Sequence, residues 1–511
     1  MNKYIKVLVF LIVFMVMIFP IINVNADVKK GLAREVVINN LTSGDTYDDG
    51  VDTFITGEDP NNYIWYSGKL WRAVSVNNEA KTTKLVTQWN ISATTYNPEN
   101  QTNFEGSYME DWLNDTTVDG FLGNLRDYEK FIVTDAKWDA TMDPNGLGSI
   151  TRPNGEATVT APVGLLNMYE YQSSYHETTY SNGYLNNGLY WWTLTPYSTS
   201  YVWNVDNSGY ASYISPSYAR GVRPSINLKS SVKIVDGDGT VSNPYRLSGD
   251  NDTNLSGTLL SSRYSGEYIR FGNEENNLYR IVSHENGSGT KIVSAEPLKS
   301  SGTFITSAFG SNTTFSSTNT IGAFMNGDYL TNYVDSTYSD MIEDSTTWYL
   351  GTVGSGTSYK LAKYADANMS STNSSTTDAK AGLLRFGELM SGQFDRYGNN
   401  TYYWTLTPYS ASDVWIVDSI GIAIYYSPSD AGGVRPSLNL KSNILITEGS
   451  GTKEDPFILA DRLENIPANP DLGDDINNPE TNDNIIIYAC LAVISVIVLV
   501  FLLVKIKTKS K

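Results

Sequence analysis

The sequence predicts an α+β fold made of two tandem domains, each rich in short strands. Tyr and Gly are abundant, with 35 and 41 residues among 511, and only 18% of residues are charged. This composition suits twisted strands and many turns better than helical bundles. In addition, the stretch 192–230 returns as 404–442 without a gap, and 28 of its 39 positions are identical. A duplicated domain of roughly 200 residues follows, which is an ordinary size for one domain.

Both ends of the chain are predicted to be targeting segments. Residues 1–26 combine two lysines, an apolar run and a small-residue site, typical of a secretory signal peptide cleaved between Ala26 and Asp27. An uncleaved anchor is the alternative. Residues 485–504 are uncharged and long enough for a transmembrane helix. The lysines of the tail 505–511 place that end in the cytoplasm, so the intervening chain is expected outside the cell.

The first repeat is assigned to residues 51–248, after a polar segment, 27–50, that we leave as a mobile lead-in or an edge strand. It opens with predicted strands at 63–66, 69–74 and 84–87, separated by Gly and Asn turns. Short amphipathic helices are predicted over 109–113 and 163–170. The duplicated stretch follows, and then strands near 232–235 and 244–247.

The second repeat is assigned to residues 257–460, after a polar linker at 249–256. It repeats the order of the first repeat, with strands at 268–271, 278–282, 291–294 and 456–459. Helices are expected at 328–330 and 381–384. Two copies make a tandem pair and not a solenoid.

A stalk rich in Asn, Asp and Pro is predicted at 461–484. Within it, Asn-Pro-Glu-Thr-Asn at 478–482 stands directly before the hydrophobic span and the basic tail. This tripartite order resembles a sortase sorting signal of the NPxTN type. The resemblance implies cleavage between Thr481 and Asn482 by a sortase, which would join Thr481 to the cell wall. A plain single-span anchor is the alternative, and both interpretations give a protein displayed on the cell surface.

The differences between the two copies of the duplicated stretch predict a binding surface. Positions 208, 210, 212 and 214 differ from their counterparts, while Gly209, Ala211 and Tyr213 between them are identical. Such alternation is typical of a strand with one face held by the core and the other facing solvent. Exchanges as radical as Tyr to Asp are expected only at exposed sites. The candidate ligand-binding residues are Tyr201, Asn204, Asn207, Ser208, Tyr210, Ser212, Ile214, Tyr218 and Arg220 in the first repeat, and Asp413, Ile416, Ser419, Ile420, Ile422, Ile424, Tyr426 and Asp430 in the second.

The two copies of this face differ in chemistry. The first carries Tyr, Asn and Ser with one Arg, a set suited to adaptable recognition. The second carries four Ile beside Tyr426, which predicts an apolar binding surface. The identical residues, such as Trp192, Trp203 and Gly221, are expected in the core. Arg223 and its counterpart Arg435 are expected to be structural charge partners.

The duplicated stretch also carries a family resemblance. Trp-Trp-x-Leu-Thr-Pro at 191–196, a variable segment, and Gly-Val-Arg-Pro-Ser-x-Asn-Leu at 221–228 resemble domains of bacterial surface proteins. More distantly, they resemble the C-type-lectin-like fold of formylglycine-generating-enzyme relatives and of the variable proteins of diversity-generating retroelements. That resemblance implies two lectin-like domains whose variable residues contact ligands. In retroelement proteins, adenine-specific mutagenesis of AAY codons yields a restricted residue set, and all ten variable pairs here fit it. A recent duplication or gene conversion with drift is the alternative.

The chemistry available outside the membrane segment argues against an enzyme. The only cysteine is Cys490, and the only histidines, His176 and His284, lie at non-equivalent places of the repeats. This removes a duplicated His-based triad or zinc centre, and we expect no cofactor or metal. The turn at 236–239, which carries two Asp, is interpreted as a hairpin turn, and a calcium site is the alternative.

The charge balance limits the partners. Without the six lysines of the end segments, the chain has 30 basic against 55 acidic residues, a surface that repels nucleic acid. We therefore expect a non-enzymatic, adhesin-like surface protein that binds an external protein or glycan. A cell-surface carbohydrate-active enzyme with paired carboxylates, such as those near Asp206 and Asp418, and a structural spacer are the alternatives.

Overall fold

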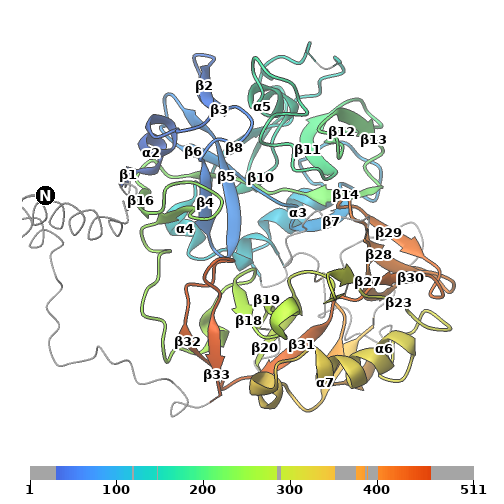
Figure 1. Ribbon diagram of the computed structural model, residues 1–511. Coiled ribbons are helices and arrows are strands. Elements are labelled where there is room, and N and C mark those ends of the chain that lie inside the picture. Colours follow the sequence, from blue (N-terminus) through green and yellow to red (C-terminus); the bar gives the residue numbers. More distant parts are fainter. Residues whose placement is uncertain are drawn as a thin grey trace, which may run out of the picture. The chain divides into compact units, whose positions relative to one another are not determined.

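The computed structural model describes residues 30–117, 120–146, 148–284, 289–350, 376–385, 388 and 401–461 (Figure 1). The described chain is mostly β, with few short helices and several sheets, some of them mixed. This confirms the prediction of many short strands with few short helices. The predicted signal peptide, the membrane span, the cytoplasmic tail, and the stalk with Thr481 and Asn482 lie outside the described residues, apart from Asp461. Within the described residues, we find no helix that is long and apolar enough to cross a membrane.

The first repeat contains a large mixed sheet and a smaller one. The large sheet has ten strands, and β17 runs parallel to β4. Its main path is β1 (Gly31–Leu32), β16 (Lys233–Asp236), β17 (Tyr245–Leu247), β4 (Tyr63–Tyr66), β5 (Lys69–Asn77), β6 (Thr83–Thr87), β15 (Ser225–Leu228) and β10 (Val163–Gly164), with β3 (Asp52–Thr56) on β5 and β2 (Asp45–Asp48) on β3.

The smaller sheet of the first repeat carries the duplicated stretch. Its order is β13 (Ala211–Ile214), β12 (Val202–Val205), β11 (Trp191–Pro196), β14 (Ala219–Val222) and β7 (Ser92–Thr95). Only the β11–β14 pair is parallel. The β11–β12 register shifts between Trp192 and Pro196, where the ladder is interrupted.

The second repeat builds the same small sheet from equivalent segments. Its order is β29 (Ala423–Tyr426), β28 (Val414–Val417), β27 (Tyr403–Pro408), β30 (Ala431–Gly433) and β23 (Thr306–Ala308), and β27 again pairs in parallel with β30. A second sheet of this repeat runs β18 (Tyr268–Arg270), β19 (Leu278–Ser283), β20 (Gly289–Ser294), β31 (Ser437–Lys441) and β26 (Ala381–Gly382). The register shift recurs between Trp404 and Pro408.

Four two-stranded sheets complete the described strands. They are β8 (Lys137–Asp139) with β9 (Thr158–Thr160), β21 (Lys299–Ser300) with β22 (Thr303–Phe304), β24 (Thr346–Tyr349) with β25 (Thr376–Ala379), and β32 (Leu445–Glu448) with β33 (Ile458–Ala460).

The described helices are short. They are α2 (Ala33–Asn39), α3 (Tyr108–Asn114), η2 (Leu122–Asn124), α4 (Tyr128–Phe131), α5 (Met168–Ser173), η3 (Leu260–Ser262), η4 (Glu274–Asn276), α6 (Thr320–Phe324), η6 (Met325–Tyr329), α7 (Leu330–Asn332) and η7 (Ser336–Met341). The helices predicted at 109–113 and 328–330 are confirmed.

Two predicted helices are corrected. Of the segment 163–170, the first part is strand β10, and α5 begins only after Asn167, whose side chain forms a capping box with Glu170. At 381–384, the chain forms strand β26 and not a helix. For the polar lead-in 27–50, we predicted either a mobile segment or an edge strand, and β1 is an edge strand. The helix α2 in the same segment was not predicted. Its Ala33, Val36 and Val37 are buried.

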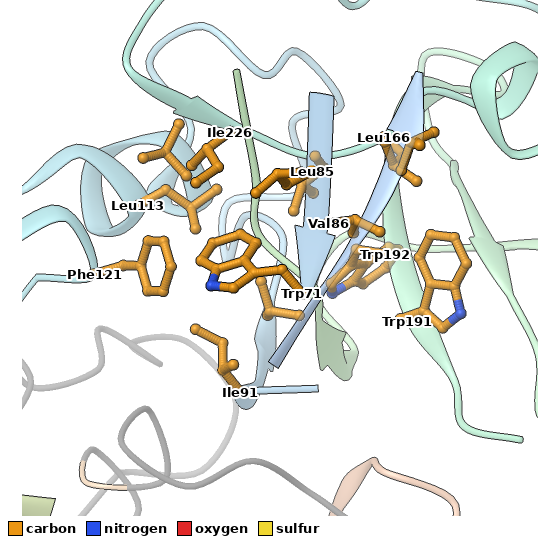
Figure 2. Packing of buried hydrophobic residues seen from close by; sticks show 14 of the residues in the cluster. Trp71, Leu85, Val86, Ile91, Leu113, Phe121, Leu166, Trp191, Trp192 and Ile226 are labelled. Carbon is orange, nitrogen blue, oxygen red and sulfur yellow. The ribbon is translucent and has the colours of Figure 1, made fainter. Parts of the chain in front are cut away.

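Large aromatic side chains fill the core of the first repeat. Trp71 packs beside Phe121 with ring centroids 6.3 Å apart, and both Trp191 and Trp192 are buried with them (Figure 2). The predicted core role of Trp192 is thereby confirmed, as is that of Trp203, which is 4% exposed. Because β11 carries Trp191 and Trp192, the core holds β11 in place and thereby fixes the base of the β12–β13 hairpin that follows β11.

Candidate functional site

The candidate site is the hairpin β12–β13 of the first repeat, together with its counterpart β28–β29. The two hairpins have the same register. In β12–β13, Trp203 lies opposite Tyr213 and Asn204 opposite Ser212, while in β28–β29 Trp415 lies opposite Tyr425. The duplicated stretch thus folds twice in the same way, and each variable residue can be compared at a matched position.

Four tyrosines of the first repeat are well exposed, and we call them together the tyrosine face: Tyr201, Tyr210, Tyr213 and Tyr218. Their exposed fractions are 43%, 47%, 48% and 57%. The rings of Tyr201 and Tyr213 lie 5.6 Å apart, whereas the ring of Tyr210 meets that of Tyr180 at 5.4 Å. Three residues of the tyrosine face were predicted to be exposed because they vary between the repeats. The fourth, Tyr213, was predicted to face the core, and that prediction is wrong.

Stacking with a neighbouring ring explains how Tyr213 stays ordered while exposed. The ring of Tyr213 lies parallel to that of Tyr197, with centroids 3.8 Å apart and planes 5° apart. Trp203 meets Tyr213 edge-on at 5.7 Å. The same stack recurs in the second repeat, where Tyr409 and Tyr425 are also 3.8 Å apart. Both repeats therefore present a constant tyrosine pair beside the variable residues, a feature that strand alternation alone does not reveal.

Asn204 and its counterpart Ile416 are buried, which corrects the prediction that they belong to an exposed patch. Their exposed fractions are 1% and 0%. The Asn204 Nδ2 donates to the Ser212 carbonyl oxygen at 3.0 Å, and the Ser212 hydroxyl donates to Asn204 Oδ1 at 3.2 Å. In the second repeat, Ile416 lies opposite Ile424. The exchange is tolerated because both members of a cross-strand pair change together, from polar to apolar.

The other variable residues of the first repeat flank the tyrosine face. Ser208 is exposed and Asn207 half-buried in the turn, where the Asp206 carboxylate accepts hydrogen bonds from the Ser208 N–H and hydroxyl. Ile214 is half-buried and packs against the core. The guanidinium of Arg220 lies over the Tyr190 ring, 5.1 Å from its centroid.

The predicted apolar residues of the second repeat are less exposed than expected. Besides Ile416, Ser419 is buried, at 7% exposed. Ile424 and Tyr426 are half-buried and pack against the second core. Asp430 is exposed, while Asp413, Ile420 and Ile422 are half-buried. The large exposed side chain of this hairpin is Tyr425, at 48% exposed.

The two identical arginines are buried and donate to backbone carbonyls. The Arg223 Nε donates to the Thr87 carbonyl at 2.8 Å, and its Nη1 donates to the Leu185 carbonyl at 2.7 Å. The Arg435 Nε donates to the Ser294 carbonyl in the same way. Burial lowers the pKa of Arg223 to about 9. Backbone carbonyls are thus partners of both guanidinium groups.

The histidines do not share a site. His176 stacks on Tyr47 with centroids 3.8 Å apart, whereas the His284 ring contacts Thr290 Oγ1 and the Arg263 carbonyl oxygen. Within the described residues, no group of three His, Cys, Asp or Glu is arranged to hold a metal. In the turn joining β16 and β17, the Asp238 carboxylate accepts from the N–H and the hydroxyl of Thr240.

A cavity of about 790 Å³ in the first repeat is lined by several carboxylates. Burial raises the pKa of Glu110, although the Gly106 N–H donates to its carboxylate. The other acidic lining residues are Glu99, Asp111 and Asp115.

This acidic lining is not repeated. Asn114 and Asn326 occupy equivalent places, since each donates from Nδ2 to the carbonyl four residues earlier. By that match, Gly322 stands where the first repeat has Glu110. Comparisons with protein-family models, curated proteins and solved structures found no match for this chain.

Proposed function

We propose that the protein is a surface-anchored, adhesin-like bacterial protein that binds an external ligand through the tyrosine face of its first repeat. One observation carries the proposal. Among the described residues, nine large hydrophobic side chains are well exposed; four of them form the tyrosine face, and a fifth, Tyr425, lies on the matching hairpin. Exposed aromatic side chains concentrated in one segment of a chain are typical of interaction sites.

Tyrosine suits such a surface for physical reasons. Its ring offers a large apolar area with few rotatable bonds, so little conformational entropy is lost when a ligand covers it. Its hydroxyl keeps the side chain compatible with water when no ligand is bound. The stacked pair of Tyr197 and Tyr213 is held in place in advance, which lowers the ordering cost of binding.

The variable residues give each repeat its own selectivity. Asp413 replaces Tyr201 and Asp430 replaces Tyr218 in the second repeat, while the tyrosine stack is unchanged. A constant platform with exchangeable neighbours is consistent with two C-type-lectin-like domains that are diversified at these positions. The shared strand order of the two small sheets supports a common domain fold. The ligand class that fits is an external protein or glycan, with cell-wall anchoring through the sorting signal near Thr481.

Binding is tested with two matched variants of the purified protein. In one, the four residues of the tyrosine face are changed to Ser. In the control, three hydrophobic residues of similar exposure elsewhere in the first repeat, Val51, Met142 and Val241, are changed to Ser. The probes are arrayed polysaccharides and arrayed extracellular proteins. We expect the first variant to lose at least tenfold in affinity for whatever the parent binds, because each central tyrosine contributes about 1 kcal/mol or more. Equal binding by all three proteins, or none by the parent, contradicts the proposal.

A carbohydrate-active enzyme is the second candidate, favoured by the acidic cavity. Burial raises the pKa of Glu110, which is the direction that favours a general acid, and Asp111 and Asp115 line the same cavity. The test is release of reducing ends from the arrayed polysaccharides. Activity in the parent that is abolished in Glu110→Gln would favour this candidate over simple binding.

A further inference from the structure

The turn of the second hairpin is bound by residues of the first repeat. The backbone N–H of Tyr190 donates to the Ile420 carbonyl at 2.8 Å, and the Asn90 Nδ2 donates to the Gly421 carbonyl at 3.3 Å. Gly421 has a φ of +78°, and a Cβ built on it would lie 3.1 Å from the Leu189 Cβ. We call Asn90, Leu189 and Tyr190 the turn-binding residues.

The flanks of the turn are apolar and buried with the first repeat. Val417 and Ala423, which precede and follow it, belong to the same cluster of buried hydrophobic residues as the core of the first repeat. Strand β29, which begins at Ala423, contacts β14 of the first repeat. Two carbonyl contacts and a shared apolar cluster thus hold this hairpin against the first repeat.

The matching turn of the first hairpin is supported differently. The Ser208 and Gly209 carbonyls accept hydrogen bonds from the Asn186 Nδ2, at 3.0 Å, and from the Tyr171 hydroxyl, at 2.5 Å. Both donors lie in the first repeat itself. The turn of the first hairpin is therefore bound by residues of its own repeat. The two equivalent carbonyls of the second hairpin are bound by residues of the first repeat.

The second repeat lacks the side chains that bind a turn. Arg223 and Arg435 donate from Nε to Thr87 and Ser294 respectively, so these two positions are equivalent. Counting three residues on, Asn90 corresponds to Pro297, whose ring has no amide donor. By the constant offset of the duplicated stretch, Leu189 corresponds to Thr401. Asn90 and Leu189 are thus specific to the first repeat, whereas Tyr190 has an identical counterpart in Tyr402.

We infer that Asn90, Leu189 and Tyr190 form an interaction surface for the hairpin turn of the second repeat. The Asn90 Nδ2 also donates to the Tyr190 carbonyl at 2.8 Å, which ties two of these residues together. If each repeat carried both a turn to be bound and residues that bind a turn, repeats could join head to tail without limit. Because the second repeat has Pro297 and Thr401 at the turn-binding positions, it does not bind a further repeat in this way. Ile420 and Gly421 then serve this internal contact, whereas the turn of the first hairpin is held within its own repeat.

Disulfide trapping in the full chain tests this assignment. The pair Leu189→Cys with Gly421→Cys, in a Cys490→Ser background, places two Cβ atoms within a few tenths of an ångström of the 3.5–4.5 Å usual for a disulfide. The control is the reciprocal pair, Thr401→Cys with Gly209→Cys. The control glycine has a similar φ of +86°, so the backbone strain of both pairs is matched.

We expect mild oxidation to form an intrachain disulfide in the first pair at least ten times faster than in the reciprocal pair, as read by mass spectrometry of linked peptides. Equal rates, or only interchain links, would overturn the assignment. If the cysteine variants do not fold, hydrogen exchange of the Tyr190 amide decides. It should be slow in the parent, about tenfold faster in Asn90→Ala, and unchanged in Asn186→Ala. Rapid exchange in the parent would also overturn the assignment.

Discussion

The buried pair of Asn204 and Ser212 allows a quantitative test of how the variable residues are arranged. The perturbation is a double-mutant cycle that converts the pair, singly and together, to the isoleucines found at positions 416 and 424. Since the two hairpins share one register, the double variant recreates an arrangement that the chain already contains.

The magnitudes follow from the two hydrogen bonds between these residues. Asn204→Ile removes both bonds, at roughly 1 kcal/mol each. Ser212→Ile removes one bond and leaves Asn204 Oδ1 without the Ser212 hydroxyl. Because Asn204 is only 1% exposed, this loss should cost about 1–3 kcal/mol. The double variant loses both bonds but gains an apolar cross-strand pair and about 1.5–3 kcal/mol from burying an isoleucine. We expect each single change to cost about 1–3 kcal/mol and the double change about 1 kcal/mol or less.

The assay is urea unfolding followed by tryptophan fluorescence, with the free energy of unfolding compared across the four proteins. The expected coupling free energy is at least about 1 kcal/mol in favour of the double variant. If the double variant is destabilised by the sum of the single effects, the two positions are independent. In that case, the explanation of the exchange as a compensated buried pair is refuted.

Three further predictions concern the framework around the site. Burial raises the pKa of Asp252, but hydrogen bonds from two arginines outweigh it and lower the pKa to about 2. The ionised Asp252 therefore stabilises the fold above about pH 5, and this stabilisation is lost as the pH falls towards 2. Asp252→Asn should lower the free energy of unfolding in urea by about 2 kcal/mol at pH 7, and by progressively less below pH 5. A loss that does not change with pH would contradict this. In Gly164→Ala, the new Cβ would lie 2.3 Å from the Trp138 ring, so the variant should destabilise the fold by about 1–3 kcal/mol. Gly327→Ala is the control, because its Cβ would meet nothing within 4 Å, and it should not destabilise the fold. Equal melting temperatures of the two variants would contradict this. Arg223→Lys cannot keep both backbone carbonyl contacts and should lower the urea midpoint, and an unchanged midpoint would show that these contacts contribute little.

Local sequence patterns predicted much of the framework. The strand at 63–66 has the predicted bounds, because Tyr-Ile-Trp-Tyr is a run of β-favouring residues closed by the Ser67-Gly68 turn. The helix at 163–170 was placed too early, because Val163 and Gly164 pair with β15. The Asn167 cap that starts α5, with Glu170 three residues later, was a readable signal.

The site was predicted only in part. Alternation identified a strand with two unlike faces, yet Tyr213 is exposed because it stacks on Tyr197, a partner that lies beyond the strand itself. The burial of Asn204 could not be predicted from one strand, since it depends on a compensating partner eight residues away. The contact between Asn90 and the Gly421 carbonyl joins residues 331 positions apart, and no local pattern signals it.

The most direct test of a variable binding surface is deep sequencing of codons 199–220 and 411–432 in a population grown from one isolate. We expect frequent, independent changes at the exposed positions 201, 208, 210 and 218. We also expect that Tyr213 stays constant and that positions 204 and 212 change only together, as a polar pair or as an apolar pair. Uniform sequences, changes spread evenly over both repeats, or independent variation at 204 and 212 would contradict it.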